Sequence, residues 1–97
     1  MPYAIKLSPA AIEDLNEAFI WYNEQVTDLG YKFIDNVNER FEGLAITPKS
    51  GSIRYDNIRC ALVRAFPYLI HYSVDSDLKI VIVYRIFHIS RKPFWEK

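Results

Sequence analysis

The sequence predicts an α+β fold in which an antiparallel helix hairpin packs on a twisted, mainly antiparallel sheet, with the element order β-α-α-β-β-β-β. Three observations lead to this prediction. Apolar residues recur with a helical period up to Ala45 and alternate after Pro48. Short connections join the later segments, and strands joined in this way pair antiparallel. The chain has 97 residues, 51% of them hydrophobic, which suits a single domain over residues 1–97 with one core.

A strand and then a helix are predicted at the N-terminus. The segment Tyr3–Leu7 is short and β-prone. It is followed by Ser8, which suits a helix N-cap, and Pro9, which suits the first helical position. The helix extends to about Val26. Its apolar positions are Ile12, Leu15, Phe19, Tyr22 and Val26, and its acidic positions, mostly on the other side, are Glu13, Asp14, Glu17 and Glu24.

A second helix follows after a break in the pattern at Thr27–Gly30. Its apolar stripe consists of Phe33, Ile34, Val37, Phe41, Leu44 and Ala45. The helix should end before Thr47–Pro48, because proline disfavours helical backbone in the residue ahead of it. Two helices joined by a short loop form an antiparallel hairpin.

Four strands are predicted after the helices. They are Ile53–Tyr55, Arg59–Ala65, Tyr68–Val74 and Leu78–Phe87, with a tight reversal at Asp75-Ser76-Asp77. The helix hairpin can cover only one face of their sheet. On the last strand, Ile80, Ile82 and Ile86 alternate with Val81, Val83 and Phe87, so both faces are apolar. We therefore expect the second face either to bind a partner or to be buried by loops and C-terminal residues of the chain itself.

Charge is divided unevenly along the chain although the formal net charge is +0. Residues 1–50 contain four Lys or Arg against eight Asp or Glu, and residues 51–97 contain eight against four. Arginines and histidines at the strand ends make a cationic rim, which suits an anionic partner such as a phosphate chain or an acidic protein segment. Because acids are scarce in the second half, we assign Arg64, Arg85 and Arg91 to partner contact, and Arg59 to a structural role.

Several kinds of site are not indicated by the sequence. Cys60 is the single cysteine, so no internal disulfide can form and a reducing, cytoplasmic location is expected. No apolar run approaches the roughly 18 residues that span a bilayer. Two histidines and one cysteine give no metal-ligand spacing, and three glycines form no phosphate-binding loop, so neither metal nor cofactor is expected. His88 and Ser90 lack the nucleophile elbow of a serine hydrolase.

Short motifs along the chain occur in the order known from one protein family. They are Ser8-Pro9-x-Ala11-x-x-Asp14-Leu15, Trp21-Tyr22, Leu29-Gly30-x-x-Phe33, Pro48-x-x-Gly51, the run Arg59 to Tyr72, and His88, Arg91, Pro93 and Trp95. Together they resemble the ParE/RelE family of toxins from bacterial type II toxin-antitoxin pairs, over nearly the whole chain. Trp95 lies one residue earlier than the family spacing places it. The resemblance implies a helix hairpin on a twisted sheet, and a cognate antitoxin whose C-terminal segment wraps the toxin.

The family includes ribosome-dependent messenger-RNA cleavers and poisons of DNA gyrase. Ribonucleolytic relatives often carry basic residues at positions that correspond here to Leu69 and Ile89. RNA cleavage needs a proton acceptor, a proton donor and a cation for the phosphate charge. His71, His88 and the arginines Arg64, Arg85 and Arg91 could supply these parts, although a histidine on a sheet is more often structural.

The function predicted from these observations is a ParE-like toxin that binds a macromolecular target, with DNA gyrase as the candidate, and that a cognate antitoxin neutralises. Catalysis is not favoured. The alternative is a ribosome-dependent endoribonuclease that uses His88 and the arginines on messenger RNA, and a third reading is a toxin fold whose toxicity has decayed. Trp95 and Phe94 would stack on a base or anchor a protein interface, or fold back as a hydrophobic lid.

Overall fold

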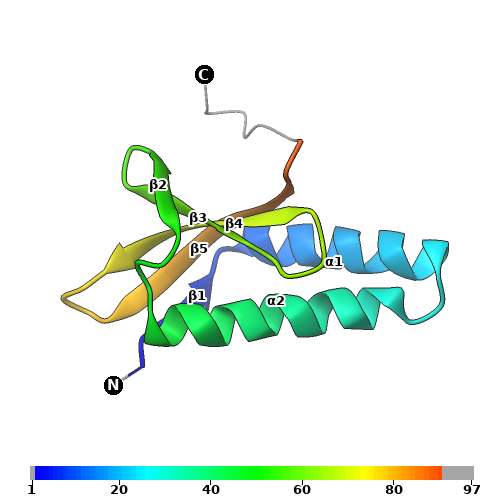
Figure 1. Cartoon of the computed structure of the whole chain (residues 1–97), viewed down its shortest axis with the longest axis horizontal. Coiled ribbons are helices and arrows are strands. Elements are labelled where there is room, and N and C mark those ends of the chain that lie inside the picture. The colour runs from blue at the N-terminus through cyan, green and yellow to red at the C-terminus, as the bar shows by residue number, and fades with distance from the viewer. Residues whose placement is uncertain (1, 91–97) are drawn as a thin grey trace.

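The computed structural model describes residues 2–90 and confirms the predicted order of elements. The elements are β1 (Ala4–Leu7), α1 (Pro9–Gln25), α2 (Leu29–Ile46), β2 (Ser52–Tyr55), β3 (Ile58–Leu62), β4 (Tyr68–Asp75) and β5 (Ile80–His88). Figure 1 shows α1 and α2 side by side and antiparallel, on the same side of the sheet. Arg91, Phe94 and Trp95 lie outside the described residues.

The five strands form one sheet in the order β1-β5-β4-β3-β2. β1 pairs in parallel with β5, from Ala4 opposite Ile80 to Leu7 opposite Val83, and all other neighbours pair antiparallel. The helix hairpin connects β1 at one edge of the sheet to β2 at the other edge. No helix within residues 2–90 is long and apolar enough to cross a membrane.

The core lies between the helix hairpin and one face of the sheet. Its fully buried side chains are Phe33, Val37 and Leu44 from α2, Val63 from the loop after β3, Ile70 and Tyr72 from β4, and Val81 and Val83 from β5. The hydroxyl of the buried Tyr72 accepts a hydrogen bond from the Gly51 N–H at 3.0 Å. A Cβ on Gly51 would lie 2.6 Å from that hydroxyl, so this contact requires glycine.

The buried face of α1 differs from the predicted stripe. Ile12 is 50% exposed and Val26 is 58% exposed, whereas Asp14, predicted on the polar side, is 8% exposed. Two small residues, Ala11 and Ala18, are buried on the same face. They let α1 lie close to β5, and Asp14 forms hydrogen bonds there, so this helix buries a carboxylate in place of larger apolar side chains.

A β-bulge on β5 changes the predicted alternation of that strand. His71 lies opposite Arg85 and Tyr72 lies opposite Val83, so Tyr84 is an extra residue. A one-residue insertion moves every later side chain to the other face. Ile86 therefore joins Val81 and Val83 in the core, while Phe87 lies on the face away from the helices. The prediction that Ile86 shares a face with Ile82 was wrong for this reason.

The face of the sheet away from the helices is partly enclosed. At its centre, Cys60, His71 and Phe87 are 8%, 4% and 2% exposed. Nδ1 of His71 lies 3.0 Å from the Tyr55 hydroxyl and 3.5 Å from the Cys60 sulfur. Toward the margin of this face, Leu62 is 57% exposed. Ile53 is equally exposed, but it pairs with Arg59, which lies opposite the core residue Tyr72, so it belongs to the helix side of the sheet. Within residues 2–90, the centre of the face away from the helices is thus buried, and its margin at Leu62 has the exposed apolar surface expected of an open face.

Two strand boundaries differ from the prediction. β3 ends at Leu62, ahead of Ala65, because Ala65 adopts a left-handed backbone with φ 66° and the chain reverses there. β5 begins at Ile80, two residues after the predicted Leu78. The Leu78 N–H instead donates to the Asp75 carboxylate at 2.9 Å, which extends the turn.

Candidate functional site

The edge of β5 that β1 leaves uncovered is closed by the beginning of α1. The Ser8 N–H donates to the Val83 carbonyl at 2.9 Å, and the Ser8 hydroxyl donates to the Tyr84 carbonyl at 2.7 Å. Six residues further along the chain, Asp14 Oδ2 accepts the Ile86 N–H at 2.9 Å. Ser8 also caps α1, as predicted, by accepting the Ala11 N–H. Side chains of α1 therefore satisfy the backbone of the bulge.

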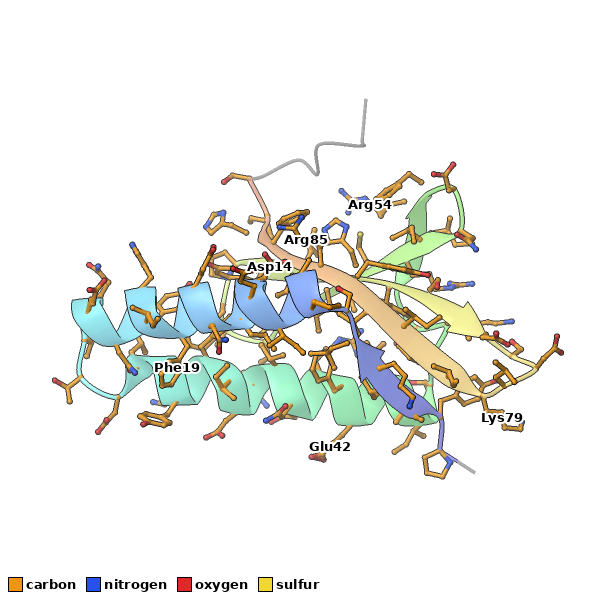
Figure 2. The ribbon with its side chains drawn as sticks, turned by 180° about the vertical axis from the view of Figure 1, so that it is seen from behind. Asp14, Phe19, Glu42, Arg54, Lys79 and Arg85 are labelled. Atoms are coloured by element: carbon orange, nitrogen blue, oxygen red, sulfur yellow. The ribbon has the colours of Figure 1, made fainter. Side chains whose placement is uncertain are left out.

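Asp14 also binds Arg85 through both carboxylate oxygens. Arg85 Nε donates to Oδ2 at 2.8 Å and Nη2 donates to Oδ1 at 2.9 Å, which is the bidentate geometry of a strong ion pair. Figure 2 shows Asp14 on α1 and Arg85 on β5 lying next to each other. The hydrogen bond to Asp14 raises the pKa of Arg85 above its already high ordinary value, against the opposing effect of burial. We call Asp14, Arg85 and the Ile86 N–H the β5 clamp.

The clamp gives Arg85 a carboxylate partner within the chain. Arg85 was assigned to partner contact because the second half of the chain has few acids. Its carboxylate partner comes from the first half, 71 positions earlier in the chain. The side chains of Arg85 and Asp14 are only 19% and 7% exposed, so this arginine is part of the packed structure.

Beside the clamp lies a hollow of about 220 Å³ between α1 and the ends of β4 and β5. A second hollow of about 410 Å³ shares Trp21, Tyr68 and His88 with it. We call the two together the His88 hollow. Trp21 is 54% exposed, which offers an aromatic surface to a partner. Glu17 and Asp14 also line the first hollow, so its polar lining includes two carboxylates.

His88 is exposed at the end of β5. Its ring packs edge-on against Tyr68 with 5.5 Å between centroids. Nδ1 accepts the Ser90 N–H at 3.2 Å and lies 2.8 Å from the Ser90 hydroxyl. Because Nδ1 is an acceptor, the neutral imidazole has its proton on Nε2. His71, by contrast, is buried on the far face of the sheet, so the two histidines do not share a site.

Two tyrosines next to the His88 hollow are held in their neutral form. Burial raises the pKa of Tyr68 above its ordinary value, and the charge of Asp14 adds to the increase. Burial, followed by the neighbouring Tyr68, raises the pKa of Tyr22. Both phenols therefore remain protonated near neutral pH and can donate hydrogen bonds, but they cannot act as proton acceptors there.

The other predicted arginines differ from Arg85 in their surroundings. Arg64 follows β3, and its side chain is 80% exposed, with Nη1 3.5 Å from an exposed Glu39 carboxylate. Arg59 donates to the carbonyls of Lys49 and Gly51 at 3.2 and 2.7 Å, in agreement with the structural role predicted for it. Arg64 is thus the described arginine of the predicted set whose side chain remains available to a partner.

The two positions compared with ribonucleolytic relatives are apolar and lie near the His88 hollow. Leu69 pairs with Phe87 across β4 and β5 and is partly buried. Ile89 is 54% exposed, and its N–H donates to the Pro67 carbonyl at 2.8 Å. Neither side chain can transfer a proton or stabilise phosphate charge.

Sequence reasoning missed Asp14 as a site residue. The sequence did contain an indication that Asp14 is buried. Asp14 lies three residues after Ala11 and four before Ala18, on the helix face where small residues permit close packing. A carboxylate at such a position indicates a buried partner.

The chain was compared with known protein families, curated proteins and solved structures. A family model described as the ParE toxin of the type II toxin-antitoxin system parDE matches residues 5–93. No curated protein sequence matches the chain.

Solved structures resemble the chain at low identity. The chromosomal ParDE toxin-antitoxin system from P. aeruginosa has a TM-score of 0.76 at 18% identity, covering 89% of this chain and 95% of that one. The complex RelBE2 from Mycobacterium tuberculosis has a TM-score of 0.61 at 20% identity, covering 91% and 99%. A mutant of the E. coli toxin RelE in the free state has a TM-score of 0.66 at 13% identity, covering 89% and 82%. These likenesses show a shared fold, and the family model shows that the chain belongs to the ParE toxin family of type II toxin-antitoxin systems.

Proposed function

We propose that this toxin stops growth in the cytoplasm by binding a macromolecular target, with DNA gyrase as the candidate, and that a cognate antitoxin neutralises it. The observation that carries the proposal is the β5 clamp. Arg85 is the described arginine nearest to the end of β5, and Asp14 binds its guanidinium through Nε and Nη2. A guanidinium whose Nε and Nη2 are bound to a carboxylate offers a phosphate only its Nη1 group, and its charge is already balanced, so it is a weak phosphate clamp.

The lining of the His88 hollow supports binding over RNA cleavage. Glu17 lines the same hollow as His88, so an RNA phosphate placed there would meet like charge, while Asp14 is balanced by Arg85. Leu69 and Ile89 add no proton donor and no cation. The loss of one such contributor typically slows a reaction by about a hundredfold or more. The exposed Trp21 instead suits a protein partner, because aromatic side chains are frequent anchors of protein interfaces.

The alternative is a ribosome-dependent endoribonuclease. One observation favours it, because the exposed imidazole of His88 points its Nε2–H away from Ser90 and could transfer a proton. In this alternative, messenger RNA on the ribosome would be the substrate, and Arg64 would supply the cation.

Two assays on one preparation separate the proposals. The purified toxin is added to a gyrase supercoiling reaction, and transcript ends are mapped on translating ribosomes. We expect inhibited supercoiling and intact transcripts. The His88→Ala variant serves as the control, and we expect it still to inhibit supercoiling, because it keeps Trp21, the proposed anchor of the protein partner. Site-specific cuts on the ribosome that disappear with His88→Ala would refute the proposal and establish the alternative.

The antitoxin is proposed to cover the exposed margin of the far sheet face. Leu62 on β3 is 57% exposed there and lies opposite Leu69 on β4. A segment that binds only the folded state raises stability by mass action. Thermal unfolding with a saturating amount of the antitoxin segment should therefore shift the midpoint upward, and Leu62→Asp should remove the shift. An unchanged midpoint for the wild-type chain would exclude this surface.

A further inference from the structure

A separate hollow of about 590 Å³ lies where the loop after β3 meets the helix hairpin. We call it the loop hollow. Its apolar lining includes Tyr22, Leu29 and Phe66, and its polar lining includes Lys32 and Arg64. The rings of Tyr22 and Phe66 meet edge-on with centroids 5.0 Å apart. The loop hollow therefore combines an aromatic floor with cationic side chains.

The loop hollow differs in charge from the surface around it. Lys32 and Arg64 line it, and no carboxylate among residues 2–90 does. The first half of the chain, which supplies both helices, contains four Lys or Arg against eight Asp or Glu. Arg64 lies 3.5 Å from the Glu39 carboxylate, and the two side chains are 80% and 61% exposed. Such a solvent-exposed pair is worth at most about 1 kcal/mol, so it does not compete strongly with a ligand.

The backbone that presents Arg64 is fixed. The Asn36 side chain on α2 donates to the Arg64 carbonyl at 3.0 Å. The Val63 N–H donates to the Tyr68 carbonyl at 2.9 Å, and Ala65 between them is held in the left-handed region. A loop that is already ordered loses less entropy when a ligand binds. Asn36 is therefore a positioning residue for Arg64.

We propose that the loop hollow binds an acidic peptide segment of a partner protein, with an apolar side chain on the aromatic floor and carboxylates on Lys32 and Arg64. A peptide is favoured over a nucleic acid because nucleic-acid binding needs an extended basic face. The chain has a formal net charge of +0, and the helices on both sides of the hollow are acidic. The loop hollow is a different surface from the His88 hollow, where we propose that a target protein binds. Its test involves neither gyrase nor ribosomes.

The test is fluorescence anisotropy of a labelled synthetic peptide in which aspartate and glutamate alternate with leucine and phenylalanine. We expect saturable binding to the full chain that weakens as salt is raised. The Lys32→Glu/Arg64→Glu variant should lose affinity by at least about tenfold, because like charges then face each other. Asn36→Ala should lose about threefold with every charge unchanged, because the loop is no longer held.

The matched control is Arg54→Glu/Lys79→Glu, which makes the same charge change at an exposed position on β2 and at one in the turn before β5, both labelled in Figure 2. We expect this control to bind within about threefold of the wild-type chain, because distant charges are screened. Urea unfolding confirms that each variant is folded, and Arg64→Ala replaces the double variant if that one is not. Absent binding, equal losses in the two double variants, tighter binding of single-stranded RNA, or self-association through this surface would each overturn the proposal.

Discussion

Arg64 and Arg85 look alike in the sequence, since each is a lone arginine at the end of an apolar strand, but the structure gives them opposite surroundings. The side chain of Arg85 is 19% exposed and is bound by Asp14 through Nε and Nη2, whereas that of Arg64 is 80% exposed and has an exposed carboxylate at 3.5 Å. The comparison shows that the role of an arginine at a strand end depends on which helix side chains lie next to it. At the β5 clamp, α1 places the carboxylate of Asp14 next to Arg85. At the loop hollow, α2 places the amide of Asn36 and the ammonium of Lys32 near Arg64.

The largest expected effect is on stability at the two arginines. Arg85→Ala would leave the buried Asp14 carboxylate without its ion-pair partner, which typically costs about 3 to 5 kcal/mol of unfolding free energy. Arg64→Ala removes an exposed charge and should change the unfolding free energy by less than about 0.5 kcal/mol. Urea denaturation measures both. Similar losses in the two variants would remove the distinction between the clamp and the loop.

A pair of glycines on α2 tests the same contrast between enclosed and open positions. A Cβ on Gly30 would lie 2.4 Å from the Phe19 carbonyl oxygen of α1, so Gly30→Ala should push the helices apart and cost about 1 to 3 kcal/mol. Gly43 has no neighbour closer than 3.5 Å, and Gly43→Ala should stabilise the helix by about 1 kcal/mol. Thermal unfolding of both variants measures the two changes in stability, which should have opposite signs.

A smaller effect is expected in the loop that presents Arg64. Ala65 has φ 66°, a left-handed backbone that costs a residue with a Cβ about 1 kcal/mol or more. Glycine removes this cost but adds unfolded-state entropy, so Ala65→Gly should raise stability by only about 0.5 kcal/mol. Denaturation midpoints of Ala65→Gly and Ala61→Gly provide the comparison, because Ala61 lies within β3 and its replacement should destabilise the sheet. A loss in both variants would show that the loop is not strained.

The smallest expected effect is a pH dependence next to the His88 hollow. The pKa values of Tyr22 and Tyr68 are raised above 10.0 in the folded chain, chiefly by burial. The unfolded chain therefore loses these protons first, and the stability that the neutral phenols contribute is complete below pH 10 and declines as the pH rises toward the folded-state pKa values. Tyr68→Phe should weaken this alkaline decline in unfolding midpoints, whereas Tyr31→Phe, at an exposed tyrosine on α2, should not.

The order of elements and most of α2 could be predicted from the sequence because they depend on local period and turn residues. The buried positions of Phe33, Val37 and Leu44 confirm the predicted α2 stripe. The clamp could not be predicted in this way, because Asp14 and Arg85 are brought together only by the parallel pairing of β1 with β5. The bulge at Tyr84 was also missed, since an extra residue leaves the run of apolar letters unchanged while it reverses the faces.

The claim that Arg85 is structural while another surface contacts the target is tested most directly by the Asp14→Asn/Arg85→Gln variant. Amide groups can keep hydrogen bonds across the clamp without the charges. Growth arrest on induction is measured beside the urea midpoint of the purified variant. The structural account predicts arrest equal to that of the wild-type toxin while the variant is folded, because the guanidinium of Arg85 is not used on the target. A folded variant that no longer arrests growth would contradict it and would return Arg85 to the target-binding surface.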